Sequence, residues 1–166
     1  MVKLHITGNA GSGKTTLARK LGEALALPVH GLDQIVWAPG WEKVPKDVVA
    51  ERVGALVAEP AWVIEGVSYQ VVEAADIVVF LDVPRRISFV RCAKRNWRYL
   101  FRSRPGLPEN CPELLIVPKL VEIIWKFKAN VRPPLLSKTE AFGERGFVVR
   151  SDSDLAPLYQ HLKLAA

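Results

Sequence analysis

The octet Gly-Asn-Ala-Gly-Ser-Gly-Lys-Thr at residues 8–15 constrains the fold of this chain most, because it matches the phosphate-binding pattern G-x-x-x-x-G-K-[ST]. The apolar segment 2–7 directly before it predicts a strand. A helix is predicted over Lys14 to Ala26, where leucines recur at every fourth position. Converging backbone N–H groups of a glycine-rich loop and the dipole of a helix N-terminus both favour an anion. We therefore predict the binding of a nucleoside triphosphate.

Size and composition exclude several other classes of protein. The chain has 166 residues with 49 % hydrophobic content, which suffices for one domain with a core. No secretory segment is visible, and no apolar run approaches the roughly 18 residues of a membrane-spanning helix. Cys92 and Cys111 show no CxxC or Cys/His clustering, so neither a disulfide framework nor a zinc site is predicted. We expect a cytoplasmic protein with no membrane partner, and the sequence specifies no oligomeric state.

The formal net charge of +6 is concentrated in residues 85–108, which hold eight Lys/Arg and no acid. The remainder has 15 basic and 17 acidic residues, since eight of the 23 basic residues lie in this segment. This distribution favours a focused site for a polyanionic ligand over a general nucleic-acid surface. A helix predicted over Pro84 to Phe101 would carry an outward stripe of Arg91, Arg95, Arg98 and Arg102. We expect its inward face to be Ile87, Val90, Ala93, Trp97 and Leu100.

Strand and helix alternate along the chain. Short continuous apolar runs are typical of strands buried on both faces of a parallel sheet. The predicted strands are 2–7, 28–31, 62–64, 77–81 and 147–150. The predicted helices are 14–26, 45–59, 84–101, 112–131, 134–142 and 155–164. This order predicts a three-layer α/β fold of the P-loop NTPase type, with a central parallel five-stranded sheet and its site at the carboxyl ends of the strands.

Five motifs spread over nearly the whole chain carry a family resemblance. They are residues 8–16, His-Gly-Leu-Asp at 30–33 with Trp-Ala-Pro-Gly-Trp at 37–41, Trp-Val-Ile-Glu-Gly at 62–66, Ala-Asp-Ile-Val-Val-Phe-Leu-Asp-Val-Pro-Arg at 75–85, and Cys-Pro-Glu at 111–113. On these motifs the chain resembles the nucleoside monophosphate kinase group, and more closely the FlaR-like proteins, also called DNA topology modulation proteins or adenylate-kinase-related kinases. The resemblance implies one domain over residues 1–166, with a short arginine-rich LID at about 91–112 that closes over ATP.

The resemblance also implies roles for individual residues. In adenylate kinases, arginines at the offsets of Arg91 and Arg95 pack on adenine and contact the phosphates, and Arg132 is a weaker further candidate. Glu65 lies where the group places the acid of its Walker B motif, so we assign Mg²⁺ to Thr15 and Glu65, although the group more often has Asp there. The residues expected to bind ATP are Gly8, Asn9, Ala10, Gly11, Ser12, Gly13, Lys14, Thr15, Thr16, Arg91 and Arg95.

For the residues that would bind the acceptor, the sequence leaves alternative roles open. Asp33 follows the second predicted strand, where it would position or deprotonate an acceptor hydroxyl; the alternative is a solvated turn former. Trp37 and Trp41 would either wall the acceptor pocket or pack in the core. Asp82 would either cap the helix after Pro84 or contact the metal. Monophosphate kinases hold the acceptor's phosphate with an arginine shortly after the third strand, and residues 66–76 contain none.

From these features we expect a Mg²⁺- and ATP-dependent phosphotransferase acting on a small-molecule acceptor, whether a nucleoside, a nucleotide or a hydroxylated metabolite. The expected catalytic residues are Lys14, Asp33, Arg91 and Arg95. The alternative is a nucleic-acid-associated or regulatory ATPase, which would bind DNA or RNA with an affinity that falls steeply with salt. A GTPase switch is disfavoured because Asn-Lys-x-Asp and Asp-x-x-Gly motifs are absent from the sequence.

Overall fold

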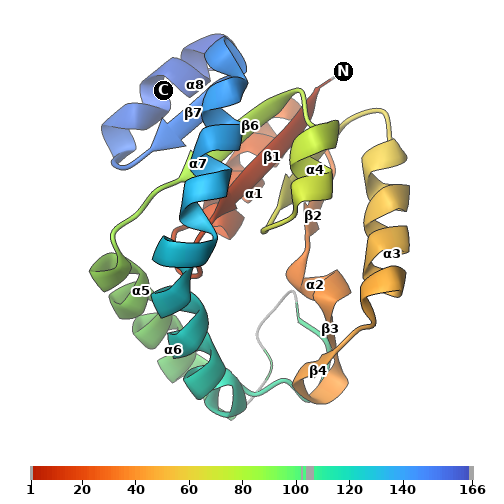
Figure 1. The fold of residues 1–166 in the computed structure, drawn as a ribbon, viewed down its shortest axis with the longest axis vertical. Helices are drawn as coiled ribbons and strands as arrows, with labels where there is room; N and C mark the ends of the chain where they lie inside the picture. Colours follow the sequence, from red (N-terminus) through yellow and green to blue (C-terminus); the bar gives the residue numbers. More distant parts are fainter. Residues whose placement is uncertain (1, 102, 104–106, 165–166) are drawn as a thin grey trace.

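A five-stranded parallel sheet forms the centre of the computed structural model, which describes residues 2–101, 103 and 107–164 (Figure 1). The strand order is β2-β5-β1-β6-β7, and every neighbouring pair runs parallel. The strands are β1 (Lys3–Gly8), β2 (Val29–Gly31), β5 (Trp62–Glu65), β6 (Ile77–Leu81) and β7 (Gly146–Val149). The predicted five-stranded parallel sheet is confirmed.

Helices cover both faces of this sheet, because successive strand residues point to opposite sides. In β6, Ile77, Val79 and Leu81 pack toward one helical layer, while Val78 and Phe80 pack toward the other. The first layer holds α1 (Lys14–Leu25) and α8 (Ala156–His161). The second holds α3 (Lys46–Ala58), α4 (Tyr69–Ala74), α7 (Arg132–Ala141) and the last turns of α6 (Glu113–Asn130). The three-layer α/β prediction is therefore confirmed.

Several short elements were not predicted from the sequence. The chain turns directly from β2 into α2 (Asp33–Val36), followed by a two-stranded antiparallel ribbon of β3 (Trp37–Ala38) and β4 (Glu42–Lys43). A 3₁₀ turn at Pro39–Trp41 joins the two ribbon strands, and others lie at Gly143–Arg145 and Asp152–Leu155. Each of α2, β3, β4 and α4 escaped prediction because it combines a short length with no more than two consecutive apolar residues within its bounds, unlike the short strands β5, β6 and β7.

The face that α5 (Arg85–Arg98) buries differs from the predicted one. Its buried residues are Ser88, Cys92 and Asn96, whereas the expected core residues Val90 and Trp97 are 55 % and 78 % exposed. The reason is the close approach of α5 to the loop after β1. A Cβ on Gly11 would lie only 2.6 Å from the carbonyl oxygen of Ser88 and 2.8 Å from Sγ of Cys92, so only small side chains fit between helix and loop.

Both α5 and α6 carry large apolar side chains that are exposed to solvent. On α6 the exposed large apolar residues are Leu114, Leu115, Val121, Ile123 and Trp125. The Arg85 guanidinium lies 4.4 Å from the centre of the Trp125 ring, which joins the start of α5 to the later turns of α6. In the described part of the chain, no helix combines the length and the apolar character that crossing a bilayer requires.

Candidate functional site

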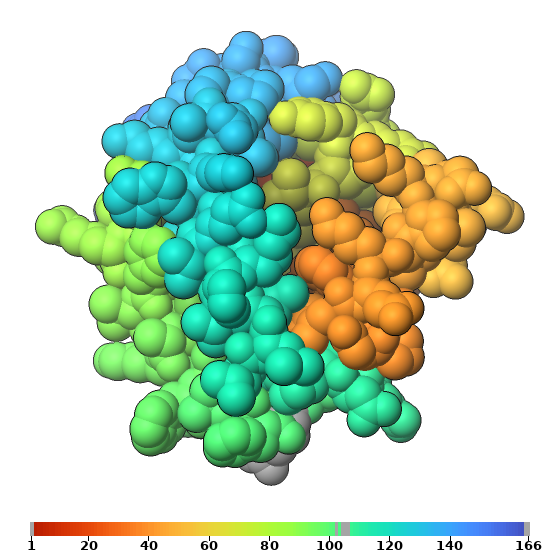
Figure 2. Space-filling view, turned by 60° about the horizontal axis from the view of Figure 1, so that its bottom comes forward, coloured from red at the N-terminus to blue at the C-terminus, as the bar shows by residue number. Residues whose placement is uncertain are grey.

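A cavity of about 850 Å³ opens at the carboxyl edge of the sheet. Its walls come from the loop after β1, the start of α1, α2, the β3–β4 ribbon, the end of β5, α5 and α6. In the space-filling view the surface is hollowed between α6 and the segment that contains α2 and the ribbon (Figure 2). This is the edge at which ligands bind in open parallel α/β sheets.

The glycine-rich loop forms one end of the cavity. Gly8, Gly11 and Gly13 have φ of 148°, 72° and 104°, which residues with a Cβ rarely adopt. The N-terminus of α1 at Lys14 has no side-chain cap and no acid in its first turn. No capping side chain therefore engages the N–H groups at this end of α1. The glycines of the adjoining loop add no side chains there. These features fit the phosphates of a nucleoside triphosphate.

Lys14 follows the last glycine of this loop, and its pKa is affected by charged groups that line the cavity. Its Nζ donates a 2.9 Å hydrogen bond to the carbonyl oxygen of Asn9. Burial lowers the pKa of Lys14, the carboxylates of Glu65 and Asp33 act to raise it, and Arg95 lowers it further. Lys14, Asp33 and Arg95 all line the same cavity.

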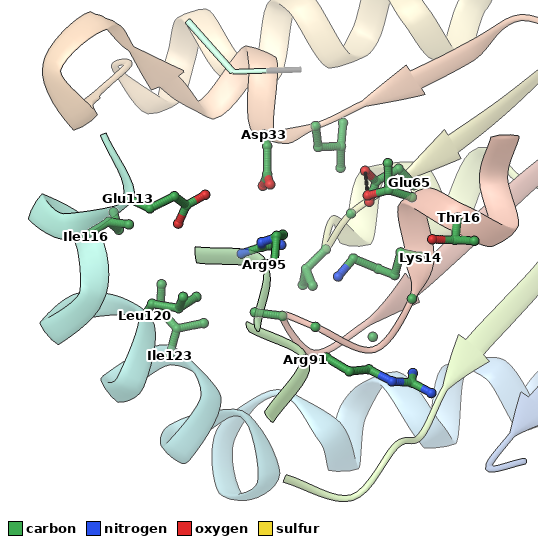
Figure 3. A pocket seen from close by; sticks show the side chains of 18 of the residues that line it. Lys14, Thr16, Asp33, Glu65, Arg91, Arg95, Glu113, Ile116, Leu120 and Ile123 are labelled. Atoms are coloured by element: carbon green, nitrogen blue, oxygen red, sulfur yellow. Dashed lines mark hydrogen bonds between the residues drawn. The ribbon is translucent and has the colours of Figure 1, made fainter. Parts of the chain in front are cut away.

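Thr15 and Glu65, predicted to hold Mg²⁺, are in direct contact. The Thr15 hydroxyl donates a 2.8 Å hydrogen bond to Oε1 of Glu65, drawn as a dashed line in Figure 3. Glu65 ends β5 and is only 8 % exposed. A hydroxyl beside a carboxylate fits a hard cation that also takes phosphate and water oxygens. Among the described residues, no group of three or more His, Cys, Asp or Glu side chains could hold a metal ion.

The arginines of α5 line the cavity beside the loop. Nη1 of Arg91 donates a 3.2 Å hydrogen bond to the carbonyl oxygen of Ser12, and Figure 3 shows this side chain running along the loop. Arg95 points into the central space and donates from Nε and Nη2 to Oδ1 of Asn96, at 3.3 Å each. Arg98 also lines the cavity. The predicted LID arginines Arg102 and Arg104 lie outside the described residues.

Asp33 faces the loop from the other end of the cavity. It is the first residue of α2 rather than a loop residue after β2, and its carboxylate points toward the central space (Figure 3). Trp37 and Trp41 also line the cavity, with ring centres 5.4 Å apart at 84°. Nε1 of Trp41 donates a 2.8 Å hydrogen bond to the carbonyl oxygen of Pro112. The two indoles therefore form part of the cavity wall, and the ribbon touches the start of α6.

Glu113 is a cavity residue that the sequence analysis assigned no role. It is the first residue of α6, is only 1 % exposed, and projects into the central space opposite Asp33 (Figure 3). Ile116, Leu120 and Ile123 follow along the same face of α6 and line the cavity. The sequence contains the Cys-Pro-Glu motif at residues 111–113. However, an acid in the first turn of a helix is common because it stabilises the helix dipole, so the motif did not indicate a cavity residue.

Asp82 and Arg132 have a different role from those predicted. Arg132 donates from Nε and Nη2 to the two carboxylate oxygens of Asp82, both at 2.7 Å, and Nε of Arg150 lies 3.3 Å from Oδ2. These hydrogen bonds, Arg132 foremost, lower the pKa of Asp82. Neither Asp82 nor Arg132 lines the cavity. The pair instead joins the end of β6 to the start of α7, which replaces the cap or metal role of Asp82 and the phosphate role of Arg132.

No family model and no curated protein match this sequence, so the FlaR-like assignment stays a prediction. Solved structures do match. A shikimate kinase from Acinetobacter baumannii, in complex with shikimate, is 19 % identical with a TM-score of 0.53, over 98 % of this chain and 94 % of that one. A shikimate kinase from Bacteroides thetaiotaomicron is 16 % identical with a TM-score of 0.54, over 98 % and 99 %. The chain therefore has the P-loop fold that these kinases share.

Proposed function

We propose that this protein is a Mg²⁺- and ATP-dependent kinase that phosphorylates a hydroxyl group of a small-molecule acceptor. One observation carries the proposal. The Lys14 side chain in the phosphate loop and the Asp33 carboxylate on the opposite wall both point into one cavity (Figure 3). A phosphoryl donor at the loop and an acceptor at Asp33 would therefore meet between them, which is the positioning that phosphoryl transfer requires.

The donor half of the cavity binds and orients the triphosphate in this proposal. Loop amides of residues 8–13 and Lys14 hold the phosphates, while Thr15 and Glu65 hold Mg²⁺. Bound Mg²⁺ would neutralise charge on the phosphate oxygens. Arg95 points into the space between the two halves, so its fixed positive charge favours the negative charge that builds on the transferring group. Arg91, beside the loop, orients the nucleotide.

The acceptor half positions a hydroxyl group in this proposal. Asp33 accepts the hydrogen bond, and then the proton, of the acceptor hydroxyl. The indoles of Trp37 and Trp41 and the apolar face of α6 line the same half of the cavity. Both Asp33 and the neighbouring indoles precede α3, so a compact segment of the chain supplies most of this wall.

The proposal is tested by following ATP consumption and product mass with the purified protein, Mg²⁺ and a panel of nucleosides, nucleoside monophosphates and small hydroxylated metabolites. Shikimate belongs in the panel because it is bound in one of the structures with this fold. Water alone and duplex DNA serve as comparisons, and Lys14→Ala as the inactive control. A phosphorylated small molecule supports the kinase. Stimulation by DNA alone, or slow hydrolysis throughout, refutes it in favour of a nucleic-acid-associated or regulatory ATPase.

A further inference from the structure

The acceptor half of the cavity lies between two segments that are far apart in sequence. Asp33 belongs to the first segment, in which α2 leads directly into the ribbon of β3 and β4. Glu113 and Ile116 belong to the second segment, the first turn of α6. Figure 3 shows Asp33 and Glu113 entering the central space from these two sides. The width of the acceptor half therefore depends on what holds the ribbon against the start of α6.

The side chain of Trp41 joins these two segments. Its Nε1 donates a 2.8 Å hydrogen bond to the carbonyl oxygen of Pro112, which directly precedes Glu113. A second contact joins the same segments, because the thiol of Cys111 donates to the carbonyl oxygen of Ala38 at 3.5 Å. Cys111 has no exposed surface. Both contacts run from the ribbon to the residues directly before α6.

The backbone of Trp41 has a conformation that bulky residues rarely adopt. Its φ is +62°, and it follows Gly40, whose φ is +77°. This left-handed region is costly for a residue with a Cβ, and it persists only where the surrounding structure fixes the residue. The Trp37 ring packs against the Trp41 ring in a T-shaped arrangement. The turn therefore holds the indole against the start of α6 in spite of the strain in its backbone.

The first turn of α6 is held in part by contacts from outside the helix. The backbone N–H groups of Glu113 and Leu114 donate hydrogen bonds of 3.1 and 3.2 Å to the carbonyl oxygens of Tyr99 and Leu100, at the end of α5. Pro118 lies inside α6 and has no N–H, so the carbonyl oxygen of Leu114 lacks the hydrogen bond that residue 118 would normally donate. The position of Glu113 in the cavity therefore depends on α5 and on the ribbon as well as on its own helix.

The ribbon is in turn connected to the sheet through α2. The backbone N–H of Leu32, just before α2, donates a 2.9 Å hydrogen bond to the carbonyl oxygen of Glu65 at the end of β5. The N–H of Val44, just after β4, donates a 3.1 Å hydrogen bond to the carbonyl oxygen of Val36, the last residue of α2. Hydrogen bonds therefore connect the sheet to α2, α2 to the ribbon, and the ribbon through Trp41 to the start of α6.

We propose, on the basis of the kinase function above, that Trp41 is a positioning residue for the acceptor. The hydrogen bond from its indole to Pro112 fixes the separation of the walls that carry Asp33 and Glu113, and so holds the acceptor hydroxyl at the distance from the γ-phosphate that transfer requires. A misplacement of about 1 Å is enough to slow such a reaction by about 100-fold. Trp41 acts through these walls, because its N–H is directed to Pro112.

The hydrogen bond can be measured without an acceptor. NMR of the protein with isotope-labelled indole nitrogens gives one N–H signal for each tryptophan, and the loss of a signal in Trp41→Phe or Trp97→Phe identifies the residue. Trp97 is the comparison because it is 78 % exposed and does not line the cavity. We expect the Trp41 N–H to exchange with solvent at least about tenfold more slowly than that of Trp97. Equal exchange rates would overturn the inference.

The positioning role is tested with the acceptor that the wild-type protein phosphorylates. Trp41→Phe keeps an aromatic ring and removes the N–H, so we expect the KM for the acceptor to rise about three- to tenfold, with the KM for Mg-ATP within about twofold of the wild type. Trp97→Phe is the matched control and should change neither value. A merely structural role of Trp41 would lower the Tm without this selective effect on the acceptor.

A second substitution keeps the test valid should Trp41→Phe fold poorly. Benzothienylalanine in place of Trp41 retains the shape of the indole, with sulfur where the N–H was, and the same rise in acceptor KM is expected. An unchanged acceptor KM in a folded variant overturns the positioning role and leaves the kinase standing. Failure of the wild-type protein to phosphorylate any acceptor refutes the kinase, and this inference with it.

Discussion

Thr15 and Glu65 are 50 residues apart in sequence, and their side chains meet through a hydrogen bond of 2.8 Å. The contact links the first turn of α1 to the end of β5, next to the donor end of the cavity. Glu65 is the last residue of β5, and its carboxylate reaches the threonine hydroxyl across the end of the sheet. In the proposed function these two groups hold Mg²⁺.

Glu65→Gln should weaken the response to Mg²⁺ more than the binding of nucleotide. The amide retains a hydrogen bond to Thr15 but has no charge for the cation, so we expect turnover at limiting Mg²⁺ to fall about 10- to 100-fold. Titration of Mg²⁺ at fixed ATP would measure this, with Glu51→Gln on the exposed surface of α3 as the control. Equal Mg²⁺ dependence in both variants would remove Glu65 from the metal site.

Lys14→Ala should abolish phosphoryl transfer without unfolding the protein. The ammonium group hydrogen-bonds the loop carbonyl of Asn9 and lies beside the space for the phosphates. Losing a fixed charge at the reacting group lowers kcat by roughly 100-fold or more. Transfer rates and thermal unfolding are compared with those of Lys46→Ala, which changes an exposed lysine at the start of α3. Retention of full activity in Lys14→Ala would contradict the role of the loop.

Asp33→Asn should separate transfer from nucleotide binding. The amide still fills the place of the carboxylate at the start of α2 but cannot take a proton, so we expect kcat to fall about 100-fold or more. The affinity for Mg-ATP, measured by calorimetry, should remain within about twofold, because Asp33 lies on the wall opposite the loop. A parallel loss of Mg-ATP affinity would place Asp33 in the donor half instead.

Gly11→Ala and Gly54→Ala should change stability in opposite directions. Residue 11 has φ of +72°, and a Cβ there would lie 2.6 Å from a backbone oxygen of α5, so we expect a loss of about 2–4 kcal/mol. Gly54 lies inside α3, where an added Cβ would come no closer than 3.5 Å to the flexible side chain of Gln70. Alanine there should add about 0.5–1 kcal/mol. Denaturant unfolding measures both, and equal effects would contradict the close packing of the loop on α5.

His5 should make folding stability depend on pH between about 4 and 6.5. Burial lowers its pKa to about 4, although Nδ1 lies 3.0 Å from the carbonyl oxygen of Ile64, and the nearby Lys14 charge lowers it further. Because the unfolded chain binds this proton more readily, stability is fully present above pH 6.5 and falls by about 3 kcal/mol as the pH approaches 4. Denaturant unfolding across this range should show the slope in the wild type and in His161→Gln, at the surface. A similar slope in His5→Gln would assign it to other groups.

The sheet and the loop were predictable because their signals are local. The run at residues 77–81 became β6 with the predicted bounds, since five consecutive apolar residues can be buried only where both faces are covered. Likewise, the glycines at 8, 11 and 13 have positive φ, and their spacing alone indicates a loop that wraps an anion.

The buried face of α5 and the place of Glu113 depend on tertiary packing, which leaves no local signal. Hydrophobic periodicity assigns Trp97 to the core, but it is exposed. The side of α5 that packs against the loop at Gly11 is instead the side of Ser88 and Cys92. In the sequence, Glu113 looks like an ordinary acid in the first turn of a helix. Only the folded structure shows that it lines a cavity together with α2 and the ribbon. From its place after a helix, Arg132 was a candidate for contacting the phosphates, but in the structure it forms an ion pair with Asp82.

The tight fit of Gly11 against Ser88 and Cys92 also bears on how such a protein can change over evolution. A larger residue at position 11 or 92 would push the loop after β1 and the arginine-bearing helix apart, so in the proposed function the donor half can vary only through coordinated substitutions. The opposite walls are assembled from short separate pieces, namely α2, the ribbon and the first turns of α6. These pieces are joined by single hydrogen bonds such as that of Trp41 to Pro112, so in the proposed function substitutions of the side chains that face the cavity could bring in a new acceptor while the phosphoryl donor stays the same.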